Sequence, residues 1–171
     1  MTHSLRGALC AVALALVACG GDRPKADLEK VPAARASCED PTASLLNVSE
    51  LMLPGRNCQS CHIPGGQAGA FRLTISGTVF RNLTVPCNSG GVSGVKVEIL
   101  DMAGNVQVTM TSNSTGNFYT AQQVSLPFRA RISQGSTTRE MVTSSSIGSC
   151  AACHQKEPKY NAEGQIYLNR S

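Results

Sequence analysis

The stretch Val95-Lys96-Val97-Glu98-Ile99-Leu100 determines the fold class, because apolar and charged side chains alternate along it. Side chains of a β-strand point to opposite faces in turn, so the three β-branched residues share one face and the two charged residues share the other. Alternation of this kind predicts a strand with one buried and one solvated face. We therefore expect a β-sheet that covers a hydrophobic core.

The same period recurs in three further runs. Their alternating apolar residues are Phe71, Leu73, Ile75 and Val79; Val106, Val108 and Met110; and Phe128, Ala130 and Ile132. Turn-forming sequences rich in Asn, Asp, Gly and Ser separate the runs at positions 88–91, 101–105, 113–117 and 133–136. Turns spaced about ten residues apart predict a mainly β protein with an antiparallel sandwich.

Three groups of residues in this region carry a resemblance to a known fold. They are Ile75-Ser76-Gly77-Thr78-Val79, residues 94–104, and Thr115-Gly116-Asn117-Phe118 followed by Leu126-Pro127-Phe128. Together they resemble the carboxypeptidase-regulatory-like, transthyretin-like β-sandwich repeat over residues 73–142. The resemblance implies an Ig-like or transthyretin-like sandwich that serves as a scaffold without catalysis, and we place this domain at residues 71–147.

The N-terminus has the features of an export signal. Arg6 precedes an apolar run at residues 8–18 that is too short to span a bilayer. The run ends in Leu16-Val17-Ala18-Cys19-Gly20-Gly21, which resembles the lipobox of bacterial lipoproteins. The resemblance implies that residues 1–18 are removed and that Cys19 is acylated, which anchors the chain to a membrane. Gly20 and Gly21, and not Asp, come directly after Cys19, which favours the outer membrane; an ordinary secretory signal with an incidental Cys is the alternative.

The regions that flank the sandwich differ in character. Residues 19–40 are polar, contain Pro and show no apolar period, so we predict a tether. Apolar positions between residues 45 and 53 fit a short amphipathic helix that Pro54-Gly55 ends. This helix lies in a predicted N-terminal segment at 41–70, and a C-terminal segment follows the sandwich at 148–171. The net charge of +4 and the lack of a Lys/Arg-rich run give no support to a nucleic-acid partner.

The pattern Cys-x-x-Cys-His occurs once in each flanking segment, as Cys58-Gln59-Ser60-Cys61-His62 and as Cys150-Ala151-Ala152-Cys153-His154. Two Cys with two residues between them present both thiols on one side of a single turn, where they can add to the two vinyl groups of a haem. The His that follows then reaches the iron. The pattern therefore predicts two covalent c-type haems, with attachment at Cys58, Cys61, Cys150 and Cys153 and with His62 and His154 as proximal iron ligands.

Other interpretations use the same cysteines. The four thiols would make an all-sulfur zinc set, or each pair would close a disulfide in an oxidising compartment. Either would leave a redox-inactive envelope lipoprotein whose sandwich binds polysaccharide or protein. A haem peroxidase, with an open iron position, is a third alternative. The His after each second Cys favours the haem interpretation: an electron carrier, not an enzyme, that exchanges electrons with redox proteins of the cell envelope.

Each proximal His leaves a sixth iron position to fill. Apart from His3 in the export signal, the chain has no further His, so a Met thioether is the natural ligand and would raise the reduction potential. The candidates are Met52, before the first motif, and Met141, before the second. Met102 lies in a predicted turn and Met110 in a predicted strand, and Lys, Tyr or water are alternative ligands.

Cys38 and Cys87 remain when the two motifs, the lipobox and the signal are set aside. An even pair in an exported protein predicts a disulfide, with unpaired thiols as the alternative. The bond would close about 50 residues and stabilise the fold by roughly 4 kcal/mol in the chain-entropy model. Since no His is left to activate a nucleophile, the sequence shows no catalytic dyad.

Overall fold

The computed structural model describes residues 49–86 and 90–169 of the chain. Its elements are, in chain order, the 3-10 turn η2 (Cys58–Ser60), strands β1 (Ile75–Phe80), β2 (Lys96–Leu100), β3 (Val106–Thr111), β4 (Asn117–Thr120), β5 (Arg129–Gln134) and β6 (Thr137–Glu140), the 3-10 turn η3 (Cys150–Ala152) and strand β7 (Ile166–Tyr167). The protein is mainly β, which confirms the predicted fold class. The predicted signal at 1–18, the tether at 19–40 and the positions Cys19, Cys38 and Cys87 lie outside the described residues.

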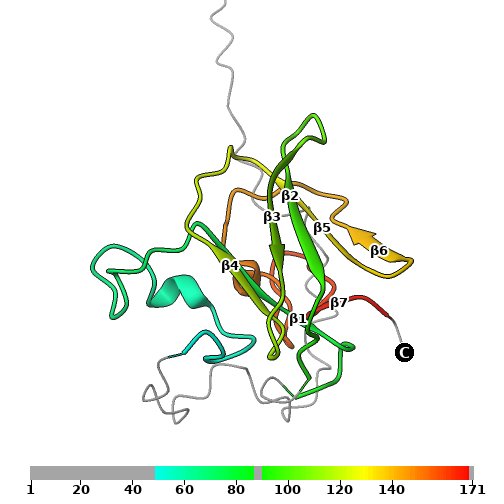
Figure 1. Cartoon of the computed structure of the whole chain (residues 1–171), viewed down its shortest axis with the longest axis horizontal. Coiled ribbons are helices and arrows are strands. Elements are labelled where there is room, and N and C mark those ends of the chain that lie inside the picture. The colour runs from blue at the N-terminus through cyan, green and yellow to red at the C-terminus, as the bar shows by residue number, and fades with distance from the viewer. Residues whose placement is uncertain (1–48, 87–89, 170–171) are drawn as a thin grey trace, which may run out of the picture.

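The strands form two sheets (Figure 1). One has the order β4-β1-β7 and the other the order β3-β2-β5-β6. Neighbouring strands are antiparallel except β1 and β7, which pair in parallel. The sheets are antiparallel, as predicted, apart from this one pair. Strand β7 comes from the predicted C-terminal segment, and the chain builds the whole second sheet before it returns beside β1, which is the long connection that a parallel pair requires.

One hydrophobic core joins the two sheets. The stretch 95–99 buries its three apolar side chains completely, as its alternation predicts. The core residues come from strands of both sheets and from the segments beside them: Ile75, Val79, Phe118 and Leu168 with the first sheet, and Val95, Val97, Ile99, Met110, Phe128 and Ile132 with the second. Because each sheet contributes one side of this core, the sheets pack face to face.

Strand β1 departs from the predicted alternation, since all six of its residues are buried. Its apolar side chains reach the core, and the N-terminal segment covers its polar Thr78, whose Oγ1 accepts a hydrogen bond from the amide of Gly55 at 2.8 Å. Phe71 was predicted to belong to this strand, but it lies outside the strand and is 53% exposed. The sheet is thus covered on both faces at β1, which is why the period of two is lost there.

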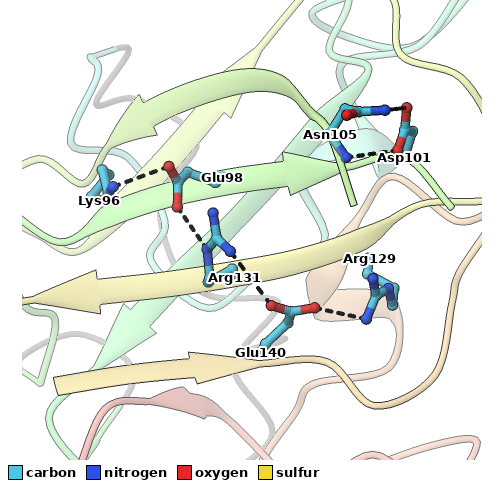
Figure 2. A network of polar contacts seen from close by, with 7 residues as sticks. All are labelled: Lys96, Glu98, Asp101, Asn105, Arg129, Arg131 and Glu140. Atoms are coloured by element: carbon cyan, nitrogen blue, oxygen red, sulfur yellow. Dashed lines mark hydrogen bonds and ion pairs between the residues drawn. The ribbon is translucent and has the colours of Figure 1, made fainter. Parts of the chain in front are cut away.

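The outer face of the second sheet carries a ladder of opposite charges (Figure 2). Glu98 accepts a hydrogen bond from Lys96 Nζ at 3.0 Å and another from Arg131 Nε at 2.8 Å. Arg131 also approaches Glu140, which pairs with Arg129 at 2.7 Å. The guanidinium of Arg131, and then the ammonium of Lys96, hold the pKa of the Glu98 carboxyl below its usual range. These cross-strand pairs help to fix the register of β2, β5 and β6.

Short polar side chains close two of the predicted turns. Asp101 Oδ1 accepts hydrogen bonds from the amides of Ala103 and Asn105, and Figure 2 shows the second of these contacts. Asn113 Oδ1 accepts from the amides of Thr115 and Asn117 in the same way. Such side chains mimic a backbone turn, so the prediction of turns at 101–105 and 113–117 is confirmed.

The helix predicted at 45–53 does not form in its described part. Residues 49–52 make a turn, which a 3.1 Å hydrogen bond from Met52 N to Ser49 O closes. Leu53 then has a φ of 44°. The ring of Pro54 disfavours a helical conformation in the residue before it, so the segment leaves the helical path before its apolar period ends. Among the described residues, no helix is long and apolar enough to cross a membrane.

Candidate functional site

The two Cys-x-x-Cys-His motifs adopt the same backbone conformation. The residue before each turn is extended, with φ −71° and ψ 92° at Asn57 and φ −83° and ψ 103° at Ser149. In each motif the His amide donates to the carbonyl of the first Cys, at 3.0 Å in the first motif and 2.8 Å in the second. One tight turn therefore holds two Cys and one His in the same order and geometry at both sites.

Both His rings are oriented by a backbone carbonyl. His62 Nδ1 lies 2.7 Å from the carbonyl oxygen of Phe71, and His154 Nδ1 lies 3.0 Å from that of Gly164. A carbonyl oxygen only accepts hydrogen bonds, so Nδ1 carries the proton in each contact. In the neutral ring Nε2 then keeps its lone pair, which is the atom and tautomer that iron ligation requires.

Strand β1 holds both motifs. The side-chain amide of Gln59, inside the first motif, donates to the carbonyl oxygens of Leu73 and Thr74 at 3.0 and 2.9 Å, just before β1 begins. On the other side, the amide of Ser76 in β1 donates to the carbonyl of Gly148 at 3.0 Å, directly before the second motif. Turns that are 92 residues apart in the sequence thus lie against one strand.

A cavity of about 290 Å³ opens beside the second motif. Cys150, Cys153 and His154 line it, together with Met141 from the residues just after β6. Most of its wall is apolar and continuous with the core of the sandwich, through Val97, Phe118, Phe128, Ala130, Ile132 and Ile166. Burial lowers the pKa of His154, so its imidazole is neutral at neutral pH.

The four Met candidates separate clearly in the structure. Met141 lines the cavity with the second motif, as its prediction as a distal ligand requires. Met52 does not line that cavity, and its carbonyl accepts a hydrogen bond from Asn117 Nδ2 at 2.9 Å. Met110 belongs to the core and Met102 is exposed in a turn, in agreement with the sequence. The structure therefore brings Met141 to the second motif.

The motif thiols lie in apolar surroundings. Burial raises the pKa of Cys150 to about 12, with smaller contributions from the nearby Cys58 and Cys153. Burial also raises the pKa of Cys58, against a smaller opposing effect of the Ser76 hydroxyl beside it. Burial therefore favours the neutral thiol at both positions.

Neither of the sulfur-based alternatives appears in the described part of the chain. No disulfide joins the motif cysteines there. Within residues 49–86 and 90–169, no group of three or more His, Cys, Asp or Glu side chains is arranged to hold a metal ion. The four thiols are thus not gathered into the tetrahedral set that a zinc ribbon needs.

Sequence reasoning missed the groups that position the motifs. The carbonyls of Phe71, Gly148 and Gly164 act through backbone atoms, which every residue type has. Ser76 and Gly77 belong to a strand that pattern alone assigns to the core. Since these contacts have no side-chain signature, only their position after folding identifies them.

Comparison with known proteins gives no match: no protein-family model fits the chain, and neither a curated protein nor a solved structure is similar to it.

Proposed function

We propose that this protein is a c-type cytochrome that carries two covalent haems and transfers electrons in the bacterial cell envelope. The observation that carries the proposal is the repeated turn: each site presents two Cys on one side and an imidazole whose Nδ1 is bound to a carbonyl. Proximal haem ligands need this orientation, because Nε2 must face the iron with its lone pair. A disulfide or a zinc set would give no reason for the oriented His.

The second site offers space and apolar chemistry for a bound group. Protein interiors contain few voids larger than a water, for which about 15 Å³ suffices, whereas this cavity measures about 290 Å³. Its apolar wall suits the faces of a porphyrin, while the guanidinium of Arg139, which also lines the cavity, pairs with Glu163 at 2.7 Å and lies over the Tyr167 ring. Cys150 and Cys153 would hold the vinyl carbons, and His154 and Met141 would bind the iron. A haem bound there supplies one-electron chemistry between Fe(III) and Fe(II).

The residues around the second site control solvent access and ligand identity. Burial of Cys153 and of the neighbouring core side chains keeps water from one side of the site. The hydrogen bond from His154 to Gly164 fixes the ring, and a thioether from Met141 would favour the reduced state. We expect this site to have the higher potential.

The first site is the more open one and suits exchange with partner proteins. Its apolar neighbours Ile63 and Phe71 are 42% and 53% exposed. Phe71 meets the His62 ring edge-on at a centroid distance of 5.9 Å, so its carbonyl and its ring both lie against the ligand. Electrons would enter or leave here, from redox proteins of the envelope, while a lipid at Cys19 would hold the chain at the membrane.

Covalent haem content tests the proposal. We expect the chain, co-expressed with a c-type haem maturation system, to give two haems per chain by pyridine haemochrome and a haem-stained band under denaturing conditions. The double variants Cys58→Ala/Cys61→Ala and Cys150→Ala/Cys153→Ala are matched controls, and each should keep one haem. A chain without covalent haem would contradict the proposal and favour the redox-inactive lipoprotein. Rapid peroxide turnover by the two-haem protein would favour the peroxidase instead.

A further inference from the structure

We infer that strand β1 is a bridge between the two haem sites, so that the haems lie close together and couple directly within one chain. This inference rests on the proposed function and goes beyond it, because two haems on one chain need not be neighbours. It is based on consecutive residues of β1, each of which lies against a different motif.

Ser76 and Gly77 are the two residues concerned. Turn η2 contacts β1, and the buried Ser76 hydroxyl, which makes no hydrogen bond, lies near the thiol of Cys58, the first Cys of the N-terminal motif. At Gly77, a Cβ atom built on the backbone would come within 3.0 Å of Cys150 Cβ, the first Cys of the C-terminal motif. Consecutive residues of a strand face opposite ways, so the two Cys approach β1 from its two sides.

Small residues make this approach possible. Any side chain at Gly77 would also overlap the ring of Phe118, at 2.5 Å from its Cζ. A Cβ at Gly148, two residues before Cys150, would lie 1.8 Å from the carbonyl oxygen of Thr74. Glycine at both positions therefore allows the second motif to pack directly on the start of β1, where backbone contacts replace side chains.

Direct contacts also tie the motifs to each other through this strand. Ser76 and Ser149 form a parallel bridge, in which Ser149 is the residue directly before the second turn. The Nε2 atom of Gln59, inside the first motif, lies 2.9 Å from the position that a Gly148 Cβ would occupy. A side chain of the first motif therefore packs against the residue at which the second motif meets β1. Thioether bonds at Cys58 and Cys150 would anchor one edge of each haem at this junction.

Circular dichroism in the Soret region tests the bridge. Two haems held close in a fixed orientation give a couplet of opposite signs around the absorption maximum, whereas independent haems give the sum of two single bands. We expect a couplet from the folded two-haem protein and its loss in guanidinium chloride, where the thioether bonds survive but the motifs separate. Because the folded and unfolded samples carry the same two haems, a difference between their spectra does not come from haem content.

The single-haem double variants provide a second readout. The sum of the spectra of Cys58→Ala/Cys61→Ala and Cys150→Ala/Cys153→Ala should lack the couplet of the parent protein. If the parent holds two haems and its spectrum equals this sum, the bridge is overturned while the cytochrome proposal stands. If the parent holds no covalent haem, the proposed function fails and the inference fails with it. Should either double variant not fold, the comparison of folded and unfolded parent protein decides alone.

Discussion

The two Cys-x-x-Cys-His segments share their local structure and differ in almost everything around it. Both form the same 3-10 turn, with the same backbone hydrogen bond and the same carbonyl contact at Nδ1. The first lies on a loop at one side of the molecule, whereas the second lies among the strands (Figure 1). Its neighbours form an apolar cavity with a Met in its wall, while the first has exposed apolar side chains.

This difference shows how one motif can serve two purposes. Four or five residues suffice to form the turn, because the hydrogen bonds that close it are within the motif. Burial, the sixth ligand and solvent access depend on residues from other elements, and these properties adjust a haem potential. We therefore expect two haems of unequal potential, with the first exchanging electrons outward and the second more enclosed.

The largest expected effect is the loss of folding stability when an aromatic side chain is removed near each site. Phe128 is 1% exposed, belongs to the core and lines the cavity of the second site. Phe128→Ala should lower the free energy of unfolding by about 3–5 kcal/mol. Phe71→Ala, beside the first motif, removes a half-exposed ring with two edge-on contacts and should cost only about 1 kcal/mol. Denaturant unfolding measures both, and equal losses would show that the first site is as deeply packed as the second.

The next largest effect is a change in the reduction potential of one haem when its Met ligand is removed. Met141→Ala should lower the potential of one haem by on the order of 0.1 V and remove the far-red absorption of thioether-bound ferric iron. The matched variant Met52→Ala should leave that haem unchanged, because Met52 does not line the cavity of the second site. Spectroelectrochemical titration resolves the two haems. A shift with Met52→Ala, or none with Met141→Ala, would reverse the assignment of the distal ligand.

A smaller effect is expected at the second position of each motif, where Gln59 and Ala151 differ. Gln59→Ala removes the amide that donates to Leu73 and Thr74, which should cost about 1 kcal/mol of unfolding free energy. The buried Ala151 makes no such contact, so Ala151→Gly should act only through its small side chain and its turn. Haem content should stay at two in both variants. If Gln59→Ala lost the first haem, the Gln59 amide would be needed to position the motif for haem attachment, and its role would not be limited to stabilising the fold.

The smallest effect on stability should come from the ion pairs of Glu98 on the second sheet. The pKa of Glu98 is lowered by Arg131 and Lys96, so its contribution to stability is complete above the unfolded pKa near 4.5 and is lost as pH falls through the lower folded pKa. Glu98→Gln should therefore cost less than about 1 kcal/mol at pH 7. The difference from the parent should vanish in acid. Unfolding at pH 7 and pH 3 gives the comparison, and an equal difference at both would rule out the ion pairs as its cause.

Strands β2, β3 and β5 of the second sheet could be predicted because their period is visible in the sequence. Val95, Val97 and Ile99 alternate with charged residues, and the structure buries the first set. Strands β6 and β7 had no such pattern, since the first is a short polar edge strand and the second has only two residues. The period failed at β1 for the opposite reason, because both of its faces are covered.

The sequence by itself determined the class of fold and the two turns, because alternation and the Cys-x-x-Cys-His spacing are local properties. It also named Met141, but could not separate it from Met52, since distance along the chain does not give distance in space. Tertiary structure alone decided the rest. It placed Met141 in a cavity with the second motif, gave each imidazole a carbonyl partner, and brought Cys58 and Cys150 to consecutive residues of one strand. Those relations depend on backbone atoms and on glycines where two segments meet, and such contacts exist only once the chain has folded.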